Sequence, residues 1–276
     1  MNYRFERRYS GSIQAVIMDW AGTTVDFGSM APVRAFQRLF RGEGIEVTLA
    51  ECRAPMGSDK REHICQMLAM ARIRDAWTQS KGSMPSEGDI DRLYQAFVQI
   101  QIECIRDSAV LIPGMAEVAT TLTERGIRLG ANTGYSRDMI VELVQRAAEQ
   151  GYSPEVVITA SDVRRGRPWP EMSLQAAIAL EATAMHACVK VDDTGVGIEE
   201  GLNAGMWTVA VAVSGNEVGL SLEDWQALAT DEQRRLRDRA HARLAATGAH
   251  YVVDSIAELP VVISDIEARL ARGERP

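Results

Sequence analysis

Residues 13–26 read IQAVIMDWAGTTVD, and this stretch decides the fold. The apolar run at 15–18 is typical of a buried strand, and it brings the carboxylate of Asp19 to a turn that contains Gly22. A carboxylate-based phosphotransferase often holds a second acid two residues after such an aspartate, but this chain has Ala21. A nucleophile without that partner needs a leaving group that requires no protonation.

Similar β-rich runs recur along the chain and alternate with helical patterns. We expect strands at 15–18, 127–131, 156–159, 188–191, 208–213 and 251–253. This alternation predicts an α/β fold, a Rossmann-like doubly wound parallel sheet. Because ligands bind beyond the carboxyl ends of parallel strands, we expect four polar clusters to converge there. They are Asp19, Asn132 to Gly134, Ser161 with Asp162, and Asp192 to Thr194.

The segment from 29 to 108 interrupts the alternation. It has no convincing strand, but its apolar residues recur at helical spacing, as in Val33, Phe36 and Phe40. We therefore predict an all-helical cap domain at 29–108, inserted into an α/β core domain formed by 1–28 and 109–276. Glycine and proline near 28 and 113 are suited to hinges between the two.

Composition limits the possible partners. The 276 residues are 46% hydrophobic and 25% charged, with a formal charge of −8. An acidic surface argues against non-specific binding to nucleic acid or to anionic membranes. Four scattered cysteines predict free thiols in a reducing compartment, and residues 1–12 lack the apolar segment of a secretory signal. We expect a cytoplasmic protein with a small-molecule ligand and no nucleic-acid or membrane partner.

Four motifs in order resemble those of the haloacid dehalogenase superfamily. They are DWAGTTVD at 19–26, LGANTGYS at 129–136, RRGRPWPE at 164–171 and VKVDDTGVGIEEGLNAGMWTV at 189–209. The resemblance implies a nucleophilic aspartate that forms an acyl phosphate, and a helical cap after the first strand. It implies that Mg²⁺ binds Asp19, the backbone carbonyl of Ala21 and Asp193, and that the substrate contacts Thr133, Gly134, Tyr135 and Arg167. These residue types suit phosphoryl transfer, since carboxylates bind Mg²⁺ and guanidinium pairs with phosphoryl oxygens.

Each residue also has a plainer interpretation. Asp19 could cap a turn, Thr133 could lie in a turn, Arg167 could be a surface residue, and the pair at 192–193 could cap a helix. Four such coincidences in this order, all near strand ends, are improbable together.

A second stretch, APMGSDKREHICQML at 54–68, lies in the predicted helical segment. Ser58 or Asp59 can cap a helix on which Lys60 and His63 share one face, although a solvent-exposed lysine is the simpler interpretation. The segment resembles the phosphonoacetaldehyde hydrolase (phosphonatase) family, in which PMG is followed by a lysine and a histidine. This resemblance extends from about residue 13 to residue 270.

The resemblance implies hydrolysis of phosphonoacetaldehyde to acetaldehyde and phosphate by a homodimer. Lys60 would form an imine with the aldehyde, His63 would relay protons, and Met56 and Ser29 would lie near the substrate. Cleavage of the C–P bond would then release an enamine, which takes its proton on carbon. No acid is needed beside Asp19, and Ala21 is compatible with this reaction.

Two positions depart from the superfamily pattern. Gly197 replaces a second acid that many members carry four residues after the metal-binding aspartate, and Asp192 replaces a frequent glycine. We assign the metal role to Asp193, with Asp192 as a possible substitute. A generic phosphatase or phosphomutase is the alternative enzyme, but it predicts an acid at position 21. A non-catalytic binding protein predicts the loss of a motif residue, and all are present.

Overall fold

The structure is a computed structural model that describes residues 9–276. Its described residues contain one six-stranded sheet in the order β3-β2-β1-β4-β5-β6, with every neighbouring pair parallel. All six predicted strands are present, and the ends of three differ from the prediction by one or two residues. The strands are β1 (Ala15–Met18), β2 (Arg128–Thr133), β3 (Val156–Thr159), β4 (Cys188–Asp192), β5 (Trp207–Val211) and β6 (Tyr251–Val253).

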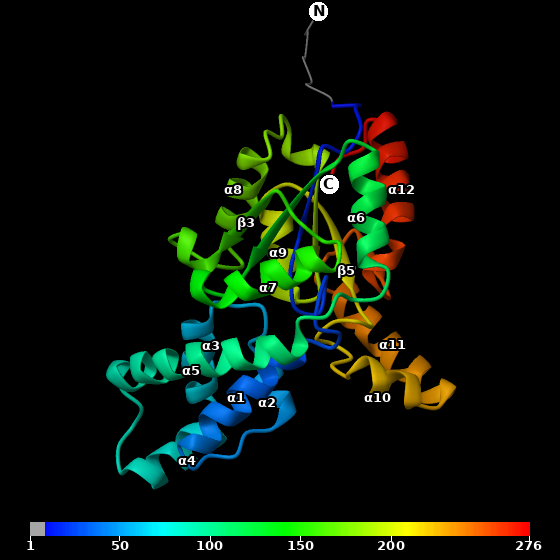
Figure 1. The fold of residues 1–276 in the computed structure, drawn as a ribbon. Coiled ribbons are helices and arrows are strands. Elements are labelled where there is room, and N and C mark those ends of the chain that lie inside the picture. The colour runs from blue at the N-terminus through cyan, green and yellow to red at the C-terminus, as the bar shows by residue number, and fades with distance from the viewer. Residues whose placement is uncertain (1–8) are drawn as a thin grey trace, which may run out of the picture.

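Helices cover both faces of this sheet (Figure 1). Within β1, Ala15 and Ile17 pack against one helix layer, and Val16 and Met18 pack against the other. Burial on both faces explains why this strand is a continuous apolar run without polar alternation. The covering helices are α6 (Met115–Glu124), α7 (Arg137–Glu149), α8 (Glu171–Ala179), α9 (Gly195–Asn203) and α12 (Leu259–Ala271).

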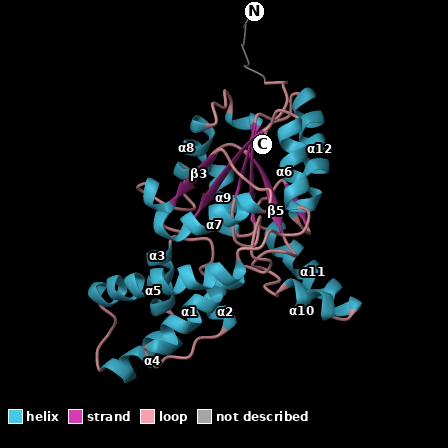
Figure 2. Ribbon diagram, in the orientation of Figure 1, coloured by secondary structure: helices cyan, strands magenta, loops and turns pink. Residues whose placement is uncertain are grey.

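Five helices between β1 and α6 form what we call the helical insertion. They lie beyond one end of the sheet and contain no strand, as predicted (Figures 1 and 2). The Phe36 and Phe97 rings stack at a centroid distance of 4.4 Å, which joins the first and last of these helices. They are α1 (Met30–Gly42), α2 (Leu49–Arg53), α3 (Lys60–Ala69), α4 (Ala71–Lys81) and α5 (Glu87–Ser108).

The strand order reverses between β1 and β4, and this reversal positions the site. The backbone N–H of Asp19 donates to the carbonyl of Val191 at 3.0 Å, so the carboxyl ends of the two strands lie side by side. A crevice forms at such a reversal because the connections leave the two strands in opposite directions. Asp19 and the Asp192–Asp193 pair therefore meet at the carboxyl ends of these two central strands.

Two further helices follow β5. The charged stretch at 231–235 lies on helix α11 (Thr230–Ala245), which follows the short α10 (Leu222–Ala227) and buries Leu244. All four cysteines are free thiols, as predicted. Among the described helices, none combines the length and the apolar character that crossing a membrane requires. Residues 1–8 of the predicted core domain lie outside the described part.

Candidate active site

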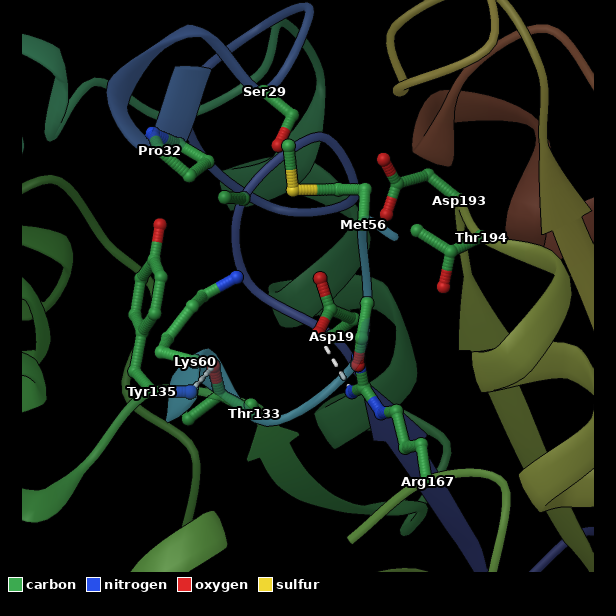
Figure 3. Close-up of a pocket in the computed structure, with 13 residues that line it drawn as sticks. Asp19, Ser29, Pro32, Met56, Lys60, Thr133, Tyr135, Arg167, Asp193 and Thr194 are labelled. Atoms are coloured by element: carbon green, nitrogen blue, oxygen red, sulfur yellow. Dashed lines mark hydrogen bonds and ion pairs between the residues drawn. The ribbon is translucent and has the colours of Figure 1, made fainter. Parts of the chain in front are cut away.

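A pocket with about 300 Å³ of empty space lies between the strand ends and the helical insertion (Figure 3). Ten of the eleven site residues predicted from the sequence line it, and only His63 does not. Pro32, Gly57 and Thr194 complete the wall. The predicted residues in the lining are Asp19, Ala21, Ser29, Met56, Lys60, Thr133, Gly134, Tyr135, Arg167 and Asp193.

The carboxylate of Asp19 faces the pocket from the end of β1 (Figure 3). Its Oδ1 accepts a hydrogen bond from Nη2 of Arg167 at 2.7 Å, whereas its Oδ2 has no hydrogen-bond partner among the described residues. Burial raises the pKa of Asp19 to about 6, although the charge of Arg167 opposes this shift. One oxygen is thus oriented by the guanidinium, and the other is free to attack or to bind a cation.

Arg167 is a buried residue, which excludes the surface interpretation. Its Nε donates to Oε2 of Glu200 at 3.0 Å, and its Nη2 reaches Oδ1 of Asn132 at 2.8 Å. Burial works against its charge, but Asp192, Asp19 and Glu200 outweigh that effect and hold the pKa of Arg167 above its usual range. The guanidinium is therefore a fixed, permanent positive charge behind the nucleophile.

Three buried carboxylates could hold a metal ion. Asp19, Asp192 and Asp193 offer oxygen atoms that lie within 4.8 Å of one another. Asp193 accepts from the backbone N–H of Asn216 at 2.8 Å and from the Thr23 hydroxyl at 3.3 Å, which leaves carboxylate lone pairs unused. Burial, Asp19 and Asp192 raise the pKa of Asp193 well above its usual range, and a bound cation would relieve this repulsion. Oxygen ligands suit a hard divalent cation.

Lys60 is the first residue of α3, and its amino group points into the pocket (Figure 3). The side chain is 4% exposed and has no ion-pair partner among the described residues. Burial lowers the pKa of Lys60 to about 8, against the opposing charges of Asp19 and Asp59. Asp59 caps this helix by accepting from the backbone N–H groups of Arg61 and Glu62, so it is the cap, and Ser58 is not.

His63 lies behind the pocket wall, although it shares a helix with Lys60. Its ring stacks on Phe36 at a centroid distance of 3.9 Å, and its Nε2 lies 2.9 Å from the carbonyl oxygen of Cys52. Because a carbonyl only accepts, Nε2 carries the proton, and the buried Nδ1 has no hydrogen-bond partner. Burial and the charge of Lys60 hold the pKa of His63 well below its usual range. The ring is therefore neutral.

The loop at 56–58 packs directly on the strand ends. A Cβ atom at Gly134 would lie 2.7 Å from the carbonyl oxygen of Ser58, and one at Gly57 would lie 2.4 Å from Oγ1 of Thr194. Both distances are shorter than carbon atoms tolerate. Glycine at these two positions therefore allows the helical insertion to close over Asp19.

One expected cluster does not join the site. Asp162 accepts from the backbone N–H and the hydroxyl of Thr159 and forms an ion pair with Arg137, away from the pocket. The prediction that Ser161 and Asp162 converge with the other strand ends is therefore wrong. Their place is taken by Arg167, because the chain continues for five residues before it turns into the site.

Sequence reasoning also missed a buried network beneath the pocket. Glu200 accepts from Asn132, from Arg167 and from the Ser173 hydroxyl, and Lys190 donates to Asn132 at 2.7 Å. The available signal was Lys190 itself, a charged residue in the middle of a strand buried on both faces. Such a residue needs partners, and these are Asn132 on β2, Asp192 on β4 and, at 3.9 Å, Glu200 on α9.

The chain is similar to known proteins in sequence. A model of haloacid dehalogenase-like hydrolases matches residues 13–205. The phosphonoacetaldehyde hydrolase of Hahella chejuensis is 54% identical over 276 residues, which cover 100% of this chain and 94% of that protein. The phosphonoacetaldehyde hydrolase of Paraburkholderia xenovorans is 47% identical over 264 residues, covering 96% and 99%.

Solved structures extend the comparison. The crystal structure of a phosphonoacetaldehyde hydrolase-like protein from Oleispira antarctica matches with a TM-score of 0.99 and 52% identity, and it covers 100% of both chains. A β-phosphoglucomutase from Clostridium difficile matches with a TM-score of 0.66 at 18% identity, which is a likeness of fold alone.

Proposed function

Since the chain belongs to the phosphonoacetaldehyde hydrolase family of haloacid dehalogenase-like hydrolases, we propose that it hydrolyses phosphonoacetaldehyde to acetaldehyde and phosphate. The observation that carries this proposal is the pairing of a buried lysine with a carboxylate in one pocket. Lys60 has a lowered pKa, and Asp19 has no acid two residues later. An amine nucleophile and a carboxylate nucleophile on one substrate match an aldehyde joined to a phosphonate.

The first step is imine formation. The neutral amine of Lys60 adds to the aldehyde carbon, and loss of water gives a protonated imine. Met56 and Ser29 line the same pocket as Lys60. We propose that His63, one helical turn from Lys60, relays protons in this step, since the free Nδ1 of its neutral ring can accept one.

The second step cleaves the C–P bond. A carboxylate oxygen of Asp19 attacks phosphorus, and the electrons of the broken bond move into the iminium to give an enamine. Arg167, Thr133, Gly134 and Tyr135 are suited to hold the phosphoryl oxygens. The enamine is protonated on carbon, and water releases acetaldehyde from Lys60. A second water cleaves the aspartyl phosphate.

The acidic group fits Mg²⁺, which would be held by Asp19, Asp193 and the backbone carbonyl of Ala21. Bound there, it supplies positive charge that reduces repulsion between the carboxylate and the phosphonate. Arg167 adds to that charge from the side of the pocket where it contacts Asp19.

The helical insertion is proposed to act as a cap domain at 29–108 over a core formed by 1–28 and 109–276. Its loop at 56–58 contacts the strand ends, so closure removes water from Lys60 and Asp19. The family resemblance further suggests a homodimer, and the free thiols suit the cytoplasm. Sedimentation velocity of the purified chain tests the dimer.

The direct test is incubation of the purified protein with phosphonoacetaldehyde and Mg²⁺. We expect equal amounts of phosphate and acetaldehyde. Borohydride added with substrate should reduce the imine and add a two-carbon unit to Lys60, located by peptide mass mapping. Asp19→Asn should still be labelled by borohydride yet release no phosphate, because an amide cannot attack phosphorus.

The same assay separates the alternative. A generic phosphatase or phosphomutase would turn over phosphate monoesters and would leave Lys60 unlabelled. Labelling at Lys81 or Lys190 in place of Lys60 would contradict the imine assignment.

A further inference from the structure

Asp192 is a buried acid of the site, and the proposed reaction assigns no role to it. It is the last residue of β4, and its side chain is fully buried. Oδ1 accepts from the backbone N–H and the hydroxyl of Thr194 at 3.0 and 2.7 Å. Oδ2 accepts from Nζ of Lys190 at 2.8 Å and lies 3.2 Å from Nη2 of Arg167. Both oxygens are thus engaged, by three hydrogen bonds and by the ion pair with Arg167, so a cation would have to displace one of these contacts.

The carboxylate occupies space that a side chain at position 197 would need. A Cβ atom on Gly197 would lie 2.0 Å from Cγ of Asp192 and 2.1 and 2.2 Å from its oxygens. The φ angle of Gly197 is not in the left-handed region, so its backbone conformation does not require glycine. Glycine at 197 is therefore explained by the close approach of Asp192 to the first turn of α9.

Two buried cations depend on Asp192. Lys190 is fully buried, and without Asp192 its remaining contacts are Oδ1 of Asn132 at 2.7 Å and Glu200 at 3.9 Å. Arg167 shares one nitrogen, Nη2, between Asp19 and Asp192. Removal of this carboxylate would leave Lys190 with an amide oxygen and a distant carboxylate, and would leave Arg167 with Asp19 and Glu200. Because buried cations need close partners, we expect both side chains to shift.

We propose that Asp192 is a positioning residue that fixes Arg167 and Lys190 behind the nucleophile, and that Gly197 is glycine to make room for its carboxylate. An acid at 192 and a side chain at 197 exclude each other in this packing. The pairing accounts for both departures from the superfamily pattern: the acid missing at 197 is supplied from the strand at 192. The effect on catalysis rests on the proposed function, whereas the packing does not.

The packing is tested by thermal unfolding in the absence of metal. Gly197→Ala should lower Tm by about 5 °C or more, because a methyl group cannot fit beside Asp192. In an Asp192→Gly background the same substitution should leave Tm unchanged or raise it by up to about 3 °C, because alanine favours helix. Gly195→Ala in the same turn is the matched control, and its effect should not depend on residue 192. An equal loss from Gly197→Ala in both backgrounds would overturn the pairing.

The positioning role is tested by Mg²⁺ titration and by kinetics. Asp192→Asn should keep saturable Mg²⁺ binding in calorimetry, weakened at most about tenfold, whereas Asp193→Asn should lose it. Loss of binding in both variants would make Asp192 a ligand and overturn the proposal.

In kinetic assays, Asp192→Gly should lower kcat/KM about 100-fold. The double variant Asp192→Gly/Gly197→Asp should have a kcat/KM at least about tenfold higher than that of Asp192→Gly. If the double variant were no more active than Asp192→Gly, the inference that Asp192 provides the acid missing at position 197 would be refuted. The unfolding and calorimetry arms need no substrate, so they remain decisive if the proposed reaction is wrong.

Discussion

The amino group of Lys60 lies 5.4 Å from the centre of the Tyr135 ring and 5.9 Å from that of Phe36. It also stands at the N-terminus of α3, where the helix dipole disfavours a cation. Burial is the largest cause of its lowered pKa, and Asp19 only partly offsets it. The residue is thus chemically distinct from a surface lysine because of its surroundings.

The first prediction concerns pH. Only the neutral amine of Lys60 can add to an aldehyde, so kcat/KM should rise with pH and level off above about 8, the pKa of this group. Below that pH, activity should fall as the amine is protonated, by about tenfold for each pH unit. The measurement is kcat/KM for phosphonoacetaldehyde between pH 6 and 9.5.

Lys60→Arg serves as the control, because its guanidinium stays charged and cannot form an imine. It should be inactive throughout the pH range. A profile in the parent enzyme that is flat between pH 6 and 9 would contradict the role given to the lysine.

At the scale of elements, Arg53 joins the helical insertion to the core. It is the last residue of α2, and it donates to the carbonyls of Gly28 and Gly219 and to Oδ1 of Asn216, all at 2.9 to 3.0 Å. Asn216 in turn donates its backbone N–H to Asp193. One arginine therefore connects the position of the insertion with the acidic group.

We predict that Arg53→Met lowers kcat/KM roughly 10- to 100-fold, because three hydrogen bonds that favour the closed arrangement are lost while the apolar stem is kept. The matched control is Arg61→Met on α3. Arg61 forms only partly exposed ion pairs with Glu87 and Asp91, which contribute little.

Steady-state kinetics and hydrogen exchange across residues 54–59 would follow the two variants. We expect faster exchange in Arg53→Met alone. If the two variants were equally active, Arg53 would not be needed to hold the helical insertion closed over the site.

At the scale of the whole molecule, the strand order concentrates charge. Asp19, Asp192 and Asp193 come from β1 and from the end of β4, and Glu200 comes from α9. Among the described residues, three buried cations face these four carboxylates, namely Arg167, Lys190 and Lys60, so the acids exceed the cations by one charge. Folding must bring this excess together, and a divalent cation would neutralise it.

Mg²⁺ should therefore stabilise the entire fold. At 100 times its dissociation constant it contributes about 2.7 kcal/mol by mass action, or roughly 5 to 10 °C in Tm. Asp193→Asn should abolish this shift. The variant should also be more stable than the parent in the absence of metal at neutral pH, because the raised pKa of Asp193 means that its buried charge opposes folding.

Differential scanning calorimetry of both proteins, with and without Mg²⁺, tests the expectation. Ca²⁺ at the same ionic strength is a useful comparison. If Mg²⁺ raised Tm equally in the parent and in Asp193→Asn, the metal would bind at a site that does not include Asp193.

The sequence by itself determined the strands, the helical insertion and most of the pocket lining. Apolar runs and helical spacing are local properties, so all six strands were predicted from residues close together in the chain. Asp19, Arg167 and Lys60 were identified because the short motifs that contain them resemble those of a known family, whereas residue type alone left a plainer interpretation for each. Their individual roles stay predictions.

Only the tertiary structure decided which side chains meet. Arg167 and Asp19 are 148 residues apart, and nothing near either one indicates their 2.7 Å contact. Packing placed His63 behind Phe36, directed Asp162 away from the site, and filled the space beside Gly197 with the carboxylate of Asp192. Contacts between distant strand ends depend on the register and twist of the whole sheet. A sequence pattern records which residues are available at those ends, whereas close packing determines which of their atoms touch.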